Sequence, residues 1–214
     1  MLVLNKQFFV DSLLSMAELA EEQRDHWTKL DSDIGDGDHG INLSIGFRAV
    51  AKQLETLDFE STDIASLYKK VGMTLLSKVG GASGPLYGSF FMKAGTHLDG
   101  EHEVDFKQFT QMIQNGVDAI VFRGKASLGD KTMLDAFLPG LEVLSHSDLE
   151  NEPLASFEAF VARMKLGSDE TIPLICKKGR AVRLGERAIG HRDPGSESAW
   201  MLMNVYLEQL RKVV

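Results

Sequence analysis

The chain has 214 residues, of which 43% are hydrophobic and 25% charged, a composition typical of a globular protein with a sizeable core. Its formal net charge of −8 disfavours a nucleic-acid-binding protein, which would present a basic surface. The single cysteine, Cys176, excludes an intramolecular disulfide bond, and the first residues lack the pattern of a signal peptide. Because no apolar run approaches the roughly 18 residues that span a bilayer, we expect a cytoplasmic protein without a membrane anchor.

Apolar residues recur at helical spacing along most of the chain. This pattern predicts helices over residues 5–29, 63–78, 86–98, 106–121, 153–177 and 196–213. Asp63 and Ser196 are expected as N-caps, and Pro153 suits a first helical turn. The sequence shows no sustained alternation of the kind that marks strands. We therefore expect an all-α fold of about eight helices, with residues 1–214 forming one domain.

An acidic segment, Leu30–Gly40, follows the first predicted helix and contains four aspartates, three glycines and one histidine. This composition is unfavourable in a helix interior and in an apolar core, so it predicts a loop. Carboxylates gathered at one point repel each other unless a cation lies among them, and a hard divalent cation such as Mg²⁺ is expected. The helical pattern that begins at Ile41 places this loop at a helix N-terminus, which favours a bound phosphate group.

Two familiar motifs do not fit the acidic segment. Gly35, Gly37 and Gly40 have the spacing of a dinucleotide-binding loop, but no strand is predicted before them, and the intervening aspartates would repel a pyrophosphate. An EF-hand loop requires a glutamate at the position that Asn42 occupies. A solvated acidic turn without any ligand stays open as an alternative.

Glycine is concentrated in four predicted loops, at residues 35–40, 80–84, 124–129 and 185–195. In an antiparallel bundle, loops separated by an even number of helices lie at the same end, so several of these loops could meet. Ser83 and the backbone amides near it suit a phosphate group, Arg180 supplies a cation, and Asp193 an acceptor. Together these groups describe a nucleotide site. Chance is the alternative, because any helical protein places its glycines in loops.

Five blocks of sequence resemble a known family. They run from Asp31 to Asn42, from Gly72 to Gly88, from Arg123 to Lys125, from Gly129 to Met133 and from Lys178 to Gly195. Their order and spacing resemble those of the nucleotide-binding L subunit of dihydroxyacetone kinase, along essentially the whole chain. The resemblance implies an eight-helix antiparallel barrel with the nucleotide site at one end.

The resemblance also implies which residues form the site. Asp31, Asp36 and Asp38 would hold two Mg²⁺ ions that bridge the phosphates of ADP or ATP, whereas Asp33 occupies a variable position and is not expected to be a ligand. A second set would contact the nucleotide: His39, Gly40, Ile41, Asn42, Ala82, Ser83, Gly124, Met133, Arg180, Asp193, Pro194 and Gly195. Met133 would cover the adenine. No side chain of this chain is expected to act as a general base, because positioning and electrostatics dominate phosphoryl transfer.

By the same resemblance, the chain passes a phosphoryl group to dihydroxyacetone held on a histidine of a separate K subunit. A phosphotransferase-system protein, the M subunit, would rephosphorylate ADP that stays bound. Two alternatives remain open, since related members act on ketoses such as erythrulose, and some bind a transcriptional regulator in their ADP form. A metal-dependent phosphatase is disfavoured, because no candidate base or nucleophile is expected to face the acidic segment. We expect no direct contact with nucleic acid or membrane, and a homodimer stays open.

Overall fold

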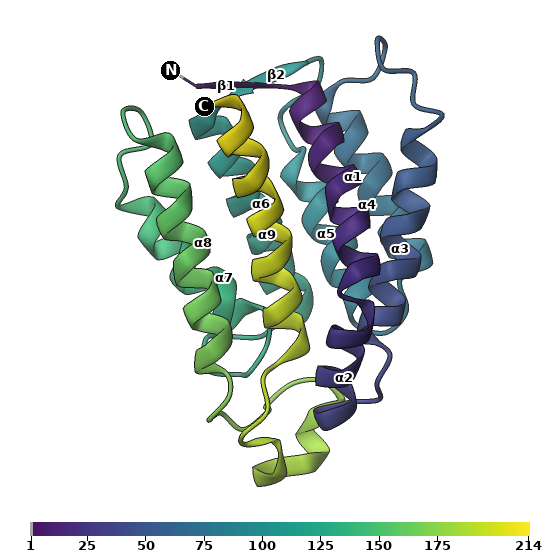
Figure 1. Cartoon of the computed structure of the whole chain (residues 1–214), viewed down its shortest axis with the longest axis vertical. Helices are drawn as coiled ribbons and strands as arrows, with labels where there is room; N and C mark the ends of the chain where they lie inside the picture. Colours follow the sequence, from purple (N-terminus) through teal and green to yellow (C-terminus); the bar gives the residue numbers. More distant parts are fainter. Residues whose placement is uncertain (1) are drawn as a thin grey trace.

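The structure, a computed structural model, describes residues 2–214 and is built almost entirely of helices (Figure 1). Its elements are β1 (Val3–Asn5), α1 (Lys6–Glu22), α2 (Arg24–Ile34), α3 (His39–Leu54), α4 (Ile64–Lys78), α5 (Ser83–Ala94), β2 (Glu103–Asp105), α6 (Phe106–Gly124), α7 (Leu134–Ser145), α8 (Pro153–Glu170), the 3₁₀ helix η1 (Arg180–Ala188) and α9 (Pro194–Val213). The predicted all-α fold class is confirmed.

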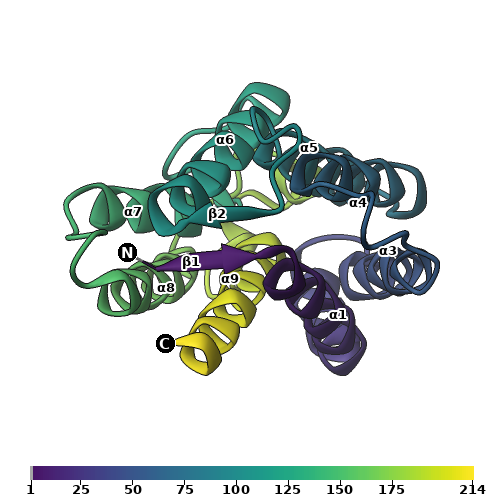
Figure 2. The same ribbon diagram turned by 90° about the horizontal axis from the view of Figure 1, so that it is seen from above.

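The long helices form a closed ring around a common core. Each helix packs against two neighbours in the order α1, α3, α4, α5, α6, α7, α8, α9 and back to α1, as the view along the ring shows (Figure 2). The helix α2 continues the direction of α1 beyond a break and contacts α3 and α9. With α2 counted as an extension of α1, the barrel has the eight helices that the sequence predicts.

The two ends of the barrel are built differently. The connections α2–α3, α4–α5, α6–α7 and α8–α9 all lie at one end, which is the lower end in Figure 1. The other end carries the antiparallel pair β1 and β2, in which Leu4 faces Val104 and both side chains are buried. The four glycine-rich loops therefore share one end, an arrangement with which the spacing of the helices is compatible.

The core inside the ring is rich in aromatic residues. Phe109 lies at its centre and packs against Phe8, Phe9, Phe157 and Tyr206, with ring centroids 5.2–6.0 Å apart. These rings come from α1, α6, α8 and α9, which surround them. Such contacts stabilise the barrel by burying large apolar surfaces in edge-to-face and tilted arrangements.

Several predicted boundaries are confirmed or corrected. The helix α4 begins after its predicted N-cap Asp63, whose side chain accepts from the backbone N–H of Ser66. The helix predicted over 153–177 ends at Glu170, because Pro173 disfavours helical backbone in the residue before it. The last helix begins two residues earlier than predicted, since Asp193 caps it and Pro194 fills its first position.

The N-terminal third differs from the prediction in three ways. The helix expected over 5–29 is divided at Gln23 into α1 and α2. The helix α2 continues to Ile34, so only Gly35–Asp38 of the acidic segment is a loop. The extra turn is stabilised by the burial of Ile34 and by the ion pair between Lys29 and Asp33, one turn apart. The strands β1 and β2 were not predicted. Within residues 2–214, no helix combines the length and hydropathy of a membrane-spanning segment.

Candidate functional site

A cavity of about 480 Å³ opens at the end of the barrel where the glycine-rich loops meet. Its wall is formed by residues from all four loops and from the first turns of the helices that follow them. A thirteenth predicted residue, Asn42, does not line the cavity but forms a hydrogen bond with Asp38, which does. The other twelve line it directly: Asp31, Asp36, Asp38, His39, Ala82, Ser83, Gly124, Met133, Arg180, Asp193, Pro194 and Gly195. The structure thus brings together residues as far apart in the sequence as Asp31 and Gly195.

Three carboxylates gather at one side of this cavity. Asp31, Asp36 and Asp38 each present an oxygen, and the three oxygens lie within 4.8 Å of one another. Oxygen-only donors at this separation match what Mg²⁺ prefers, and an ion among them would relieve their mutual repulsion. Asp33, in contrast, lies on α2 and pairs with Lys29, apart from this group.

Backbone geometry holds the three carboxylates in place. One oxygen of Asp31 accepts from the backbone N–H groups of Asp38 (2.9 Å) and His39 (3.2 Å), so the loop folds over the end of α2. A side chain at Gly35 would collide with the Asp31 carboxylate, and Gly37 has a φ of +72°, which favours glycine. These two glycines are needed to bring Asp36 and Asp38 back toward Asp31.

The pKa of Asp38 reflects its burial first and the neighbouring negative charges second. Burial raises the pKa of its carboxyl, and the neighbouring Asp36 and Asp31 add to this, against a hydrogen bond from Asn42 and the charge of Arg180. The Asn42 side chain also lies beside Gly80, so it links the acidic loop to the α4–α5 loop. A carboxylate that resists ionisation among other carboxylates is one that a cation would stabilise.

His39 lies buried behind the acidic loop with both ring nitrogens paired. Nδ1 is 3.0 Å from the hydroxyl of Ser83, and Nε2 is 2.9 Å from the hydroxyl of Ser198, which in turn meets the hydroxyl of Tyr87 at 2.8 Å. Burial lowers the pKa of His39 to about 4, so the ring is neutral near pH 7. His39 therefore orients Ser83, the hydroxyl that faces the cavity, and has no free nitrogen for a ligand.

The opposite wall of the cavity is largely apolar. It includes Leu86, Ile120, Ala126, Met133 and Leu134. The Met133 side chain is buried and lies against Gly195, where an added Cβ would come within 3.7 Å of its terminal methyl. A flat aromatic base would fit between such apolar side chains, and a polarizable thioether packs well against it.

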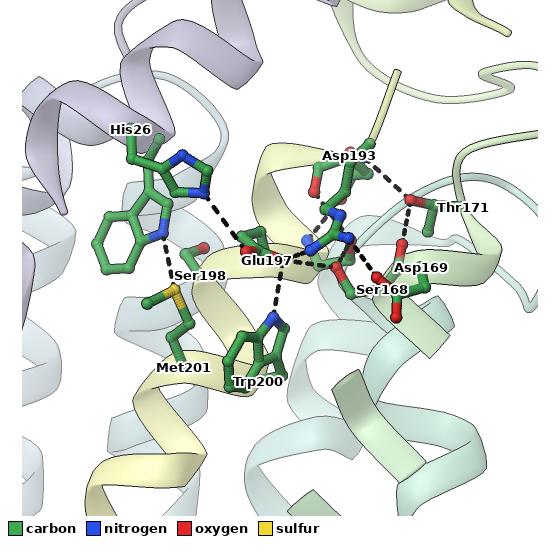
Figure 3. A network of polar contacts seen from close by, with 12 residues as sticks. His26, Ser168, Asp169, Thr171, Asp193, Glu197, Ser198, Trp200 and Met201 are labelled. Carbon is green, nitrogen blue, oxygen red and sulfur yellow. Dashed lines mark hydrogen bonds and ion pairs between the residues drawn. The ribbon is translucent and has the colours of Figure 1, made fainter. Parts of the chain in front are cut away.

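The turn Asp193–Gly195 is fixed from below by a buried polar network (Figure 3). Asp193 caps α9 through the N–H of Ser196, while its own N–H donates to the hydroxyl of Thr171 (3.0 Å). Glu197 accepts from Arg192 (2.5 Å), from the indole of Trp200 (2.7 Å) and from Ser168 (3.1 Å), and lies 3.4 Å from His26 of α2. The network joins α2, α8 and α9 directly beside the cavity.

Arg180 lies on the segment that crosses the open side of the cavity. Its guanidinium forms an ion pair with Asp36, and Lys178, Gly179 and Ala181 beside it also line the cavity. Both charged side chains of the pair are substantially exposed. The segment can therefore bring positive charge next to the acidic loop from the solvent side.

Two predicted contacts lie away from the cavity wall. Ile41 is exposed on α3 and faces a separate shallow groove, and Gly40 packs against the backbone of Arg24 and Thr28 in α2. The close approach at Gly40 sets how α3 crosses α2. Sequence reasoning missed the apolar wall and Lys131, which also lines the cavity. The wall residues follow the periodicity of ordinary core positions, and Lys131 lies in a polar loop where a lysine is normally solvated.

Comparison with known proteins places this arrangement in a family. The profile of the DAK2 domain matches residues 33–208. The chain belongs to the DAK2 domain family. It is 63% identical over 213 residues to the ADP-binding subunit DhaL of the PEP-dependent dihydroxyacetone kinase 2 of Listeria innocua, covering 100% of this chain and 99% of that protein. It is 38% identical to the ADP-binding subunit DhaL of Escherichia coli, covering 94% of this chain and 96% of that protein.

A solved structure agrees with the DAK2 fold. The dihydroxyacetone kinase of C. freundii in complex with AMP-PNP and Mg²⁺ superposes with a TM-score of 0.68 at 26% identity, covering 93% of this chain and 32% of that protein. This DAK2 chain therefore spans about a third of the length of that kinase. The eight-helix barrel is thus shared with a protein whose structure contains a nucleotide analogue and Mg²⁺.

Proposed function

We propose that this DAK2 chain is the ADP-binding subunit of a dihydroxyacetone kinase and transfers a phosphoryl group from a Mg²⁺-bound nucleotide. The observation that carries the proposal is the cavity in which three carboxylates face an apolar wall across a hydroxyl and backbone amides. Carboxylates suit the metal, the hydroxyl and amides suit phosphates, and the apolar wall suits a base. The 63% identity to a DhaL subunit over the full chain supports the same assignment.

The residues divide the work by position. Asp31, Asp36 and Asp38 would hold two Mg²⁺ ions, which supply the charge that neutralises the phosphates during transfer. Ser83, oriented by His39, and the backbone at Ala82 would hold phosphate oxygens, and Arg180 would approach them from the open side. Gly124, Met133 and the Asp193–Gly195 turn would enclose the rest of the nucleotide. His39 is not available as a general base, since both its ring nitrogens are occupied.

The acceptor is proposed to come from other proteins. We infer that dihydroxyacetone is presented by a separate K subunit, and that bound ADP is rephosphorylated by an M subunit rather than exchanged for ATP. The names of the L. innocua and E. coli relatives, both PEP-dependent and both ADP-binding, support this mode. Their dihydroxyacetone activity favours that acceptor over an erythrulose-type ketose. A regulator bound in the ADP form and a homodimer are compatible additions, which pull-down and sedimentation would test.

The metal-binding role is tested by Asp36→Asn and Asp38→Asn. Each change removes a ligand charge while leaving the helices intact, so the affinity for ADP with Mg²⁺ should fall about 100-fold or more. Nucleotide released from the purified proteins is quantified by mass spectrometry, with circular dichroism to verify folding. Asp33→Asn is the matched control, because it removes a carboxylate from the same segment outside the cluster. Wild-type nucleotide content in both Asp36 and Asp38 variants would refute the assignment.

The proposal that bound ADP is rephosphorylated in place is tested by measuring its exchange with free nucleotide. Purified protein in Mg²⁺ is mixed with isotopically labelled ATP, and incorporation into the protein-bound pool is followed over time. We expect bound ADP that does not exchange on the timescale of turnover with the K and M subunits. Rapid replacement by labelled ATP would instead make the chain an ATP-dependent kinase subunit.

A further inference from the structure

The segment that crosses the open side of the cavity, residues 172–191, is an independent feature of the fold, which we call the strap. It contains η1 and lies at the lower end of the barrel in Figure 1. The strap has a small hydrophobic cluster of its own, in which Cys176 and Ala188 pack against Ile34 at the end of α2. This cluster is separate from the main core, so opening the strap would uncover Ile34 and leave the main core intact.

Lys131 lies in the α6–α7 loop, outside the strap, and its buried side chain contacts both ends of the strap. It is 2% exposed, and its backbone has a left-handed φ of 61°. The ammonium donates to the carbonyl oxygens of His191 (2.6 Å), Ala188 (2.7 Å) and Leu174 (3.0 Å), with that of Ile172 at 3.4 Å. These four carbonyls belong to the start and the end of the strap.

The ammonium has no capacity left for a ligand. A lysine has three donors, and four carbonyl oxygens already surround them. Although Lys131 lines the cavity, it is therefore unsuited to bind a phosphate. Its hydrogen bonds are charge-assisted and join both limbs of the strap, next to the 2.9 Å backbone bond from Gly190 to Ile172. Removing the ammonium would take the donor from the carbonyls of Leu174 and His191, whereas those of Ile172 and Ala188 keep the backbone N–H groups of Gly190 and His191.

We propose that Lys131 is a positioning residue that holds the strap closed over the cavity and thereby sets the rate at which bound nucleotide leaves. The proposal rests on the proposed function for the identity of the ligand. The strap carries Lys178–Ala181 over the cavity and Arg180 to the acidic loop, so its position determines whether the mouth is covered. A covered mouth suits a nucleotide that is retained as a cofactor.

The chain contains its own reporter of strap opening. Cys176 is the single cysteine of the sequence, is 3% exposed, and lies in the strap cluster. Its reaction with a thiol reagent such as dithiobis(nitrobenzoate) requires the strap to open. Burial raises the pKa of this thiol, and the charge of Lys131 works in the opposite direction. Loss of Lys131 would thus make the thiol intrinsically less reactive, so a faster reaction can only report exposure.

Lys6 provides a matched control at the other end of the barrel. It is also buried, at 4% exposed, and its ammonium donates to the carbonyl oxygens of Phe59 and Thr62. Lys131→Met and Lys6→Met both remove a buried ammonium from backbone carbonyls and both cost stability. A purely structural role for Lys131 predicts that the two variants behave alike.

The experiment measures Cys176 labelling in nucleotide-free protein and release of radiolabelled ADP from the Mg²⁺ complex. In Lys131→Met we expect both rates to rise about tenfold or more, and in Lys6→Met we expect both to stay at the wild-type values. Labelling of Lys131→Met at the wild-type rate, or equal acceleration in the two variants, would overturn the proposal. If no variant or wild-type protein binds ADP, the proposed function fails, while the labelling rates still test Lys131.

A second measurement needs no variant and covers the case in which Lys131→Met does not fold. Saturating ADP with Mg²⁺ should slow the labelling of Cys176 in the wild-type protein, because a filled cavity and a closed strap stabilise each other. Equal labelling rates with and without ADP, in protein shown to bind it, would overturn the link between the strap and nucleotide release.

Discussion

Asp193 shows how one residue serves both the fold and the site. Its carboxylate caps α9, and the same turn lines the cavity. Burial raises the pKa of this carboxyl to about 7, with the negative charges of Asp135 and Asp31 adding to the effect, against a hydrogen bond from Ser196 and the charge of Lys131. The burial of Asp193 follows from its place beneath the mouth of the cavity.

The raised pKa of Asp193 predicts a pH-dependent stability. Its folded-state pKa, about 7, lies above the value of about 4 in an unfolded chain, so the folded state binds a proton more tightly. This contribution to the free energy of unfolding is complete below pH ~4 and is lost as the pH rises toward 7, by at most ~4 kcal/mol. Asp193→Asn removes the titration and keeps a good N-cap.

The measurement is urea unfolding of nucleotide-free wild type and Asp193→Asn at several values between pH 4 and pH 7. The other titrating groups are common to both proteins, so the difference between them isolates Asp193. We expect the wild type to lose stability relative to the variant as the pH rises. Parallel pH profiles would show that Asp193 has an ordinary pKa.

At the scale of the elements, α2, α8 and α9 meet around one buried carboxylate, that of Glu197 (Figure 3). Burial raises the pKa of Glu197, but hydrogen bonds from Trp200 and Arg192 outweigh this and lower it overall. The group is therefore charged at neutral pH. It holds the end of α8 and the start of α9 together, and its contact with His26 connects them to the helix that carries Asp31.

Glu197→Ala tests whether this network stabilises the junction. The change leaves the Trp200 indole and one nitrogen of Arg192 without an acceptor, while the other nitrogen of Arg192 keeps Asp169. We therefore expect a loss of about 2–3 kcal/mol in the free energy of unfolding. Glu208→Ala, on the exposed face of the same helix, removes an ion pair with Arg211 and should cost under about 0.5 kcal/mol. Urea unfolding measures both. Equal effects would mean that the buried network contributes no more than a surface pair.

How far the elements could be predicted depends on how local their signals are. The start of α4 was predicted because its cap is adjacent, and Pro173 was a local signal that would have ended α8 correctly. The pair β1 and β2 could not be predicted, because each strand has three residues and its partner lies about a hundred residues away. Short strands of this kind are formed by closing the end of the barrel, which is a tertiary effect.

The site was predictable to the extent that its residues are chemically conspicuous. Aspartates, glycines and Arg180 stand out in the sequence, and the even spacing of the loops is compatible with several of them meeting at one end of the barrel. The apolar wall was not predictable, because Leu86 and Ile120 follow the same periodicity as core residues. Lys131 was missed for the opposite reason, since a lysine in a loop is normally solvated and nothing local reveals its four carbonyl partners.

At the scale of the whole molecule, the contacts that stabilise the barrel lie apart from the loops that form the cavity. The β1–β2 pair lies at one end and the aromatic core inside the ring, whereas the acidic loop, the strap and the cavity lie at the other end. Loops at the functional end can therefore be rich in glycine and charge, because the helices are held by contacts made elsewhere. Substitutions in the middle of the barrel are expected to change stability and leave nucleotide retention unaffected.

The hydroxyl pair Tyr68 and Tyr206 allows that separation to be tested. The two oxygens lie 2.6 Å apart, both side chains are buried, and the bond joins α4 to α9, which are not neighbours in the ring. Tyr68→Phe or Tyr206→Phe alone leaves one buried hydroxyl without its partner and should lower the free energy of unfolding by about 1–2 kcal/mol. The double variant removes both hydroxyls, so its loss should be smaller than the sum of the two single losses. Urea unfolding of all four proteins gives the coupling energy, and ADP content should equal that of the wild type throughout. Additive costs would show that the hydroxyls find other partners, and lost nucleotide would show that the core and the site are coupled.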